Sequence, residues 1–182
     1  QIWSAVKELN KAKNISSTMA ILKFEACAET SANEPKFRDF IATIGGNFDL
    51  GTLNLSVATI ARPFLTPLAW AYYSAFSAII MSAVTKMQIL KIGVKDPARY
   101  LNSEYPNKLL KTLLPHRTEY IDNNDDSVHH YLLDEIEQLL LLELKNIQDG
   151  KEADRDNAQR AAEITKDVEN ITIEMSKMQA DA

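Results

Sequence analysis

The sequence is poor in the residues that crosslink a chain or interrupt its secondary structure. Among 182 residues there are 5 glycines, 6 prolines and one cysteine, Cys27. So few glycines and prolines exclude a collagen-like or low-complexity chain. A single cysteine excludes a disulfide framework and a zinc site built from several cysteines. With 46% hydrophobic and 25% charged residues, the composition is that of a globular protein with one domain, or one domain and an appendage.

The usual signatures of catalysis and of metal or cofactor binding are also missing. Gly45-Gly46 lacks the glycine spacing and the Lys-Ser/Thr pair of a phosphate-binding loop. His129 and His130 are adjacent, so on a helix they point about 100° apart and are poorly placed to bind one metal ion together. Cys27 lies among acidic and apolar neighbours, an environment that keeps a thiol protonated. We therefore predict no catalytic residue, no metal site and no cofactor, and the sequence favours a protein that is not an enzyme.

The net charge of −5 conceals a strong polarity along the chain. Residues 1–85 carry a charge of +1, residues 86–117 carry +5, and residues 118–182 carry −11. These values exclude a uniformly basic protein that coats nucleic acid through its net charge. They leave room for a nucleic-acid contact that is confined to one basic face.

The basic stretch of residues 86–117 contains the candidate nucleic-acid site. Its seven cationic side chains are Lys86, Lys91, Lys95, Arg99, Lys108, Lys111 and Arg117. Three rings that could stack on bases lie among them: Tyr100, Tyr105 and His116. Cations that neutralise phosphates, interleaved with aromatic rings, are typical of nucleic-acid-binding surfaces. The same cations could instead pair with the acidic C-terminal helices of their own chain, and the sequence leaves both interpretations open.

Almost every segment has the apolar periodicity of a helix, so we predict an all-α multi-helix bundle. Thr66 as N-cap, Pro67 in the first turn and Gly93 as C-cap delimit a long central helix at about 66–92. This helix includes most of an uncharged run, 64–85, whose 22 residues are enough to cross a membrane. The run contains several Ser, Thr and Tyr residues, and no second such run accompanies it. We therefore predict a helix buried at the centre of the bundle and not a membrane span.

Several further helices are expected around this centre, including the following three. The first runs over about 16–30, capped by Ser16 or Ser17. The second begins with Asn33 as cap and Pro35 in its first turn, and ends at Gly45-Gly46. It is expected to direct four apolar residues inward: Phe37, Phe40, Ile41 and Ile44. The third is a long helix over about 127–148 with a wide apolar face, preceded by a turn.

The end of the chain changes character after Asp149-Gly150. We predict a bundle domain over residues 1–150 and a C-terminal amphipathic helix over residues 151–182. Apolar residues of this helix are spaced alternately by three and four, like the a and d positions of a coiled coil. The candidate partner-helix stripe consists of Ile164, Val168, Ile171, Met175 and Met178. It could pack on the bundle or reach a partner subunit, and in the second case the chain forms a homo-oligomer.

Two sequence motifs in the middle of the chain are informative when they are taken together. Residues 70–76 read Trp-Ala-Tyr-Tyr-Ser-Ala-Phe, and residues 116–122 read His-Arg-Thr-Glu-Tyr-Ile-Asp, followed by the long apolar helix. Together they resemble the HEPN family of helical-bundle nucleotide-binding and ribonuclease domains. Many members carry an Ala-Tyr-Tyr-x-x-Phe helix and, later, an Arg followed by a short polar run that ends in Asp-Tyr or His. The resemblance covers roughly Leu65 to Ile147.

The resemblance implies a binding role more than a cleaving one. In ribonucleases of this family an Arg is followed after four to six residues by a His, so that the Arg steadies the phosphate while the His handles protons. After Arg117 the corresponding positions, 122–124, hold Asp, Asn and Asn. Ser77 also stands where relatives often place a His. The resemblance therefore implies a non-cleaving member used for binding or dimerisation, in which Arg117, Lys108 and Lys111 form a phosphate-contacting patch.

Three classes of function are compatible with the sequence. The first is a degenerate HEPN-like module, nucleic-acid-associated or oligomerising, as in a toxin–antitoxin or antiviral system. The second is a structural, self-assembling protein, such as a viral nucleocapsid or filament subunit, that contacts nucleic acid through residues 86–117. The third is a helical ligand-binding protein or enzyme with a pocket beside Tyr72, Tyr73 and His116. The expected partners are RNA or other nucleic acid and further copies of the chain, in the cytoplasm or, for the second class, within a virion.

Overall fold

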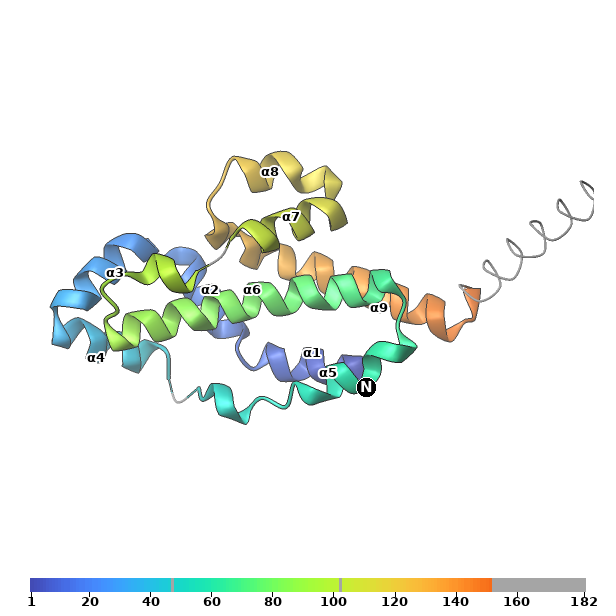
Figure 1. The fold of residues 1–182 in the computed structure, drawn as a ribbon, viewed down its shortest axis with the longest axis horizontal. Coiled ribbons are helices and arrows are strands. Elements are labelled where there is room, and N and C mark those ends of the chain that lie inside the picture. Colours follow the sequence, from blue (N-terminus) through green and yellow to red (C-terminus); the bar gives the residue numbers. More distant parts are fainter. Residues whose placement is uncertain (47, 102, 152–182) are drawn as a thin grey trace, which may run out of the picture. The chain divides into compact units, whose positions relative to one another are not determined.

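A computed structural model describes residues 1–46, 48–101 and 103–151, and every regular element within these ranges is a helix (Figure 1). The predicted all-α bundle is confirmed. By their internal contacts the residues divide into a first unit, 1–141, and a second unit, 142–182. The predicted C-terminal helix, with its stripe from Ile164 to Met178, lies outside the described residues, so the boundary expected at residue 150 stays a prediction.

The first unit is organised around α6, which spans Pro67–Ile92. Its ends carry the predicted signals: Thr66 Oγ1 accepts a hydrogen bond of 3.1 Å from the N–H of Ala69, and Gly93 closes the helix at φ +76°. Apolar residues lie on all its sides, and 13 of its 26 residues are buried. Length and composition would let α6 cross a membrane, yet 56% of its most apolar window is buried inside the protein.

Short helices cover α6 on several sides. The elements that contact it are α1 (Ile2–Asn10), α2 (Lys13–Ile21), α3 (Phe24–Asn33), α4 (Pro35–Ile44), α7 (Glu104–Leu113) and the 3-10 helix η5 (Asp126–Leu132). Figure 1 shows α3 and α4 near the end of α6, and α5 (Ser56–Ala61) beside α1 near its start. Four other 3-10 helices lie in the connections: η1 (Leu50–Thr52), η2 (Arg62–Phe64), η3 (Pro97–Tyr100) and η4 (Pro115–Arg117). Finally, α8 (Thr118–Asp122) packs beside α7, and α9 spans Leu133–Gln148, of which residues 142–148 belong to the second unit.

The expected helix over 16–30 is two helices in the structure. The backbone is extended at Leu22 and Lys23, which separates α2 from α3. Ser16 is therefore not a cap but a buried residue inside α2. The break leaves Ile21 76% exposed and allows the next residues to turn, so that the Phe24 ring is buried 5.3 Å from the ammonium of Lys86 on α6.

The prediction for α4 is correct in its bounds and wrong in its cap and in part of its buried face. Because a residue before proline avoids the helical region, Glu34 and not Asn33 precedes the helix. Of the four residues expected inside, Ile41 is buried, whereas Phe40 is 57% and Ile44 is 41% exposed. The physical reason is a close approach to α6, where a Cβ on Gly45 would lie 2.6 Å from the Lys91 side chain. This approach turns the face of positions 41 and 45 inward and leaves the neighbouring stripe in solvent.

The helix expected over 127–148 begins as 3-10 helix. Asp125 caps η5 by accepting a hydrogen bond of 2.9 Å from the N–H of Ser127, and α-helical geometry starts only at Leu133. Within the first unit, Leu133, Ile136 and Leu140 of α9 are buried, as the apolar pattern predicts.

The end of α6 is joined to α3 and α4 by a compact polar contact. The buried hydroxyl of Ser31 donates to the Leu90 carbonyl, and Arg38 Nη1 donates to the Ser31 carbonyl at 2.6 Å. A Cβ on Gly93 would lie 2.7 Å from that same Ser31 oxygen. Position 93 thus combines a left-handed backbone with a close approach of another chain segment, and both conditions require glycine.

Gly93→Ala is expected to lower the free energy of unfolding by about 2–4 kcal/mol, of which about 1–2 kcal/mol is the cost of the left-handed conformation. Gly46→Ala is the matched control, because Gly46 also has a positive φ, +56°, but no atom within 4 Å of its Cβ position. Urea denaturation followed by circular dichroism measures both variants. Equal losses in the two would contradict the close contact at Gly93.

Candidate nucleic-acid interface

Four of the seven cationic residues proposed from the sequence are held in ion pairs. Lys86 pairs with Asp126, Arg99 with Asp96, Lys111 with Asp122 and Arg117 with Glu135. The partners of Lys86, Lys111 and Arg117 come from the acidic half of the chain, after residue 117. For these three residues, the structure therefore agrees with pairing inside the chain, the alternative that the sequence left open.

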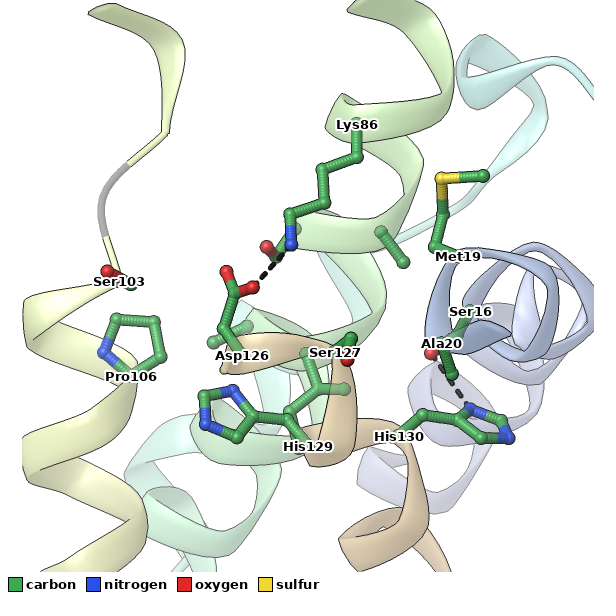
Figure 2. A pocket seen from close by; sticks show the side chains of 14 residues that line it. Ser16, Met19, Ala20, Lys86, Ser103, Pro106, Asp126, Ser127, His129 and His130 are labelled. Carbon is green, nitrogen blue, oxygen red and sulfur yellow. Dashed lines mark hydrogen bonds and ion pairs between the residues drawn. The ribbon is translucent and has the colours of Figure 1, made fainter. Parts of the chain in front are cut away.

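Lys86 is the clearest departure from a surface role. It is only 6% exposed, and its ammonium lies 2.5 Å from the carboxylate of Asp126 on η5 (Figure 2). A buried ammonium needs such a partner, because removing a charge from water costs several kcal/mol. Lys86 therefore fastens η5 to α6, and it is too buried in this conformation to belong to a surface that contacts phosphate.

A small polar cavity surrounds this ion pair. Its lining comes from α2, α6, the start of α7 and η5, and includes Lys86, Asp126, Ser127 and His129 (Figure 2). The cavity has a volume of about 30 Å³, which is room for one or two water molecules and not for an organic substrate. Hydroxyl, carboxylate and imidazole groups are suitable partners for such a water.

The third function class expected its pocket elsewhere, beside Tyr72, Tyr73 and His116. In the structure Tyr72 and Tyr73 are buried in α6, whereas the His116 side chain is 57% exposed.

The two adjacent histidines of η5 face different partners. His130 Nδ1 lies 3.0 Å from the hydroxyl of the buried Ser16 on α2, and His129 is itself 5% exposed beside the cavity (Figure 2). Burial lowers the pKa of His129, and the charge of Lys86 acts in the same direction against the nearby Asp126. Burial, followed by the charge of Lys13, lowers the pKa of His130 as well. Both rings are thus held neutral at neutral pH, in the contacts that attach η5 to α2 and α6.

Acidification is expected to destabilise the fold through these two histidines. Their pKa values are lower in the folded chain than in the unfolded one, so the unfolded chain takes up protons first as the pH falls below about 6.5. Thermal unfolding should show Tm falling between pH 7.5 and 5.5, by roughly 2–4 °C for each kcal/mol lost. This window lies above the range in which the carboxylates titrate.

The variant His129→Gln/His130→Gln provides the control for that pH dependence. It removes both titrating rings while keeping polar side chains at the same positions, so its Tm should change less than that of the parent protein over the same interval. An equally steep dependence in the variant would assign the effect to other groups.

Lys111, His116 and Arg117 lie on the hairpin formed by α7, η4 and α8. Lys111 is paired with Asp122 within the hairpin. His116 Nε2 and Arg117 Nε lie 2.5 and 3.0 Å from the two oxygens of one carboxylate, that of Glu135 on α9. Burial raises the pKa of Glu135, but the hydrogen bonds from His116 and Arg117 outweigh it, so that the net shift is downward. Lys111, His116 and Arg117 thus all have carboxylate partners, and such half-exposed pairs are worth about 0–1 kcal/mol each.

The remaining proposed residues present a polar, aromatic surface to solvent. Tyr100 at the end of η3 is 63% exposed, and Tyr105 in the first turn of α7 is 61% exposed. Lys95 and Lys108 are exposed, and neither forms an ion pair with any residue that the structure describes. Arg99 is 79% exposed despite its local pair with Asp96, at 2.8 Å. We define the basic–tyrosine surface as Lys95, Arg99, Tyr100, Tyr105 and Lys108.

Two neighbouring features limit this surface. Lys91 is half-buried and its ammonium lies 3.4 Å from the carbonyl of Gly46, so it faces the α4 end of the bundle. Lys95 borders an open groove whose opposite wall, on α3, carries Glu25 and Glu29. A polyanion in contact with Lys95 would be repelled by these carboxylates and is expected to run toward α7.

A separate apolar surface lies where the chain enters α6. Ile60 in α5 is 59% exposed, Phe64 in η2 is 75% exposed and Leu68 in α6 is 42% exposed. The one charge between them, Arg62, lies 5.0 Å from the centre of the Trp70 ring. Sequence reasoning treated this region as part of the buried run and missed the exposed surface. Its signal is present nevertheless, because the two prolines, Pro63 and Pro67, interrupt the helix at this point.

Sequence reasoning also missed the specific counter-ions Asp122, Asp126 and Glu135, although it anticipated acidic partners in general. Among residues 1–46, 48–101 and 103–151, no group of three or more His, Cys, Asp or Glu side chains could hold a metal ion. Cys27 is half-buried, and burial raises the pKa of its thiol.

No protein-family model, curated protein or solved structure matches the chain. The fold defines the class of the protein as an all-α bundle, and its side chains alone indicate a function.

Proposed function

We propose that the protein is a non-catalytic helical module that binds single-stranded nucleic acid through the basic–tyrosine surface. The observation that carries this proposal is that residues 95–108 include two tyrosines, each more than 60% exposed, and two exposed lysines without an ion pair to a described residue, Lys95 and Lys108. An exposed tyrosine ring is available for stacking, and every nucleobase offers a flat face on which such a ring stacks. The free ammonium groups supply the phosphate contacts.

Single strands fit this surface better than a duplex does. The two rings lie on a 3-10 turn and on the first turn of a ten-residue helix, five positions apart in the chain. A duplex hides its base faces, so exposed rings gain little from it, whereas unstacked bases are available in a single strand. The HEPN resemblance supports the same function, since it implies a member used for binding and not for cleavage. The cavity at Lys86 is too small to enclose an organic substrate.

The protein is expected to bind a fluorescently labelled oligouridine of about 12 nucleotides, with an affinity that falls as salt rises. Tyr100→Ala/Tyr105→Ala should weaken binding by about tenfold or more at an unchanged salt slope, because stacking contributes about 1–3 kcal/mol per base. Lys95→Glu/Lys108→Glu should abolish binding at physiological salt and flatten the slope. Fluorescence anisotropy at several salt concentrations measures each effect.

A matched charge reversal provides the control. Lys7→Glu/Lys36→Glu changes the net charge by the same amount on α1 and α4, where both lysines are exposed, and should alter binding much less. Binding that depends equally on both pairs of lysines would reflect net charge alone and would overturn the proposed surface.

A second candidate function, self-assembly, is favoured by the apolar surface of Ile60, Phe64 and Leu68. Contiguous exposed apolar side chains mark protein interfaces more often than free surface. Two copies could meet across a twofold axis at this surface. This candidate and nucleic-acid binding use different residues and are compatible.

Phe64→Glu is expected to convert the oligomer into a monomer, since it introduces two carboxylates across the axis of a symmetric contact. Light scattering coupled to size exclusion measures the mass. Phe40→Glu, at a comparably exposed phenylalanine on α4, is the control and should leave the mass unchanged. A wild-type protein that is monomeric at about 100 μM, a concentration above the Kd of most specific oligomers, would contradict this second function.

A further inference from the structure

One carboxylate of the first unit engages two neighbouring side chains at once, an imidazole and a guanidinium. Glu135 Oε1 lies 2.5 Å from His116 Nε2, and Glu135 Oε2 lies 3.0 Å from Arg117 Nε. Both donors stand on η4, at the tip of the α7–α8 hairpin, and Glu135 stands in the first turn of α9. The contact is open to solvent, because the side chains of His116 and Arg117 are 57% and 47% exposed.

The two donors are arranged to bind two oxygens of a single oxyanion. Each donates to a different oxygen of the same group, which is the arrangement that a guanidinium and a second donor make with a phosphoryl group. A phosphate diester offers the same pair of charged oxygens as a carboxylate. An imidazole and a guanidinium from consecutive residues are therefore equally suited to a nucleic-acid phosphate, and in this structure a side chain of the protein takes its place.

We propose that His116 and Arg117 form a phosphoryl-binding site that is occupied by Glu135 of the same chain, so that Glu135 competes with nucleic-acid phosphate. The inference rests on the proposed function in one respect, namely that the phosphate comes from the strand bound at the basic–tyrosine surface. Lys108 lies on α7, in the same hairpin, which connects the two surfaces through one short helix. A strand that displaces Glu135 would gain two further contacts.

The contacts of Glu135 with His116 and Arg117 are weak enough for a phosphate to displace the carboxylate. Pairs between half-exposed charges are weak, since water solvates the separated groups well. Glu135 forms no other hydrogen bond or ion pair with a described residue, so only its contacts with His116 and Arg117 must break to release it. The downward shift of its pKa keeps the carboxylate charged at neutral pH, so Glu135 remains an active competitor under ordinary conditions.

Glu135→Gln tests the proposal, because it removes the charge while keeping the size and shape of the side chain. With the labelled oligouridine, the variant is expected to bind about fivefold more tightly and with a salt slope steeper by roughly 0.7 for each phosphate gained. Glu137→Gln on the same helix, which removes one negative charge without touching His116 or Arg117, should improve binding less than twofold. Glu135→Gln/Arg117→Ala should lose the gain. Glu135→Ala is a second variant with the same expected direction, should the glutamine variant fold poorly.

A titration with tripolyphosphate, followed by calorimetry, separates this inference from the proposed function. If Glu135→Gln binds tripolyphosphate more tightly than wild type and Glu135→Gln/Arg117→Ala does not, the phosphoryl site stands even if oligouridine does not bind. If Glu135→Gln binds both probes no better than Glu137→Gln does, while circular dichroism shows it folded, the inference is wrong. Oligouridine binding that depends on Tyr100 and Tyr105 would then still support the proposed function.

Discussion

The apolar character of α6 on all of its sides is the constraint on which the first unit depends. A helix with one apolar face can lie on a surface, whereas a helix that is apolar all round must be enclosed. Enclosure requires several partners, and α1, α2, α3, α4, α7 and η5 supply them. Helices of about ten residues are not stable alone in water, so their stability depends on the surface that they bury against α6. The central helix and its neighbours are therefore mutually dependent.

Lys86 is the charged residue buried on this helix, and it explains the position of η5. Burial of an ammonium without a counter-ion would cost several kcal/mol, and Asp126 provides the counter-ion from a segment forty positions later in the chain. His129 and His130 then lie where burial keeps them neutral, next to the cavity and to Ser16. The ion pair of Lys86 thus helps to hold η5, which also packs on α2, and protonation of the two buried histidines should loosen it.

The opposite charges of the middle and the end of the chain pair with each other inside the molecule. Much of the positive charge of residues 86–117 is offset by carboxylates that follow in the sequence, and the hairpin of α7 and α8 brings these groups together. The surface that we propose for a partner is the smaller one of Lys95, Arg99, Tyr100, Tyr105 and Lys108. Recognition by such a surface depends on stacking as much as on charge, which suits a strand whose bases are unpaired.

The fold class followed from the sequence because helix periodicity, Thr66, Pro67 and Gly93 are local signals that act within a few residues. The charges of residues 1–85, 86–117 and 118–182 and the apolar face of α9 can likewise be predicted from neighbouring residues. Side-chain burial was not determined locally: Phe40 and Ile44 have the spacing of core residues, yet the approach of Gly45 to α6 turns them outward. Ion pairing was not local either, since Lys86 and Asp126 are forty residues apart, and Arg117 and Glu135 eighteen. The sequence determined which helices form and which charges exist, and only the tertiary structure decided which charges meet, because pairing depends on distances that the packing of α6 establishes.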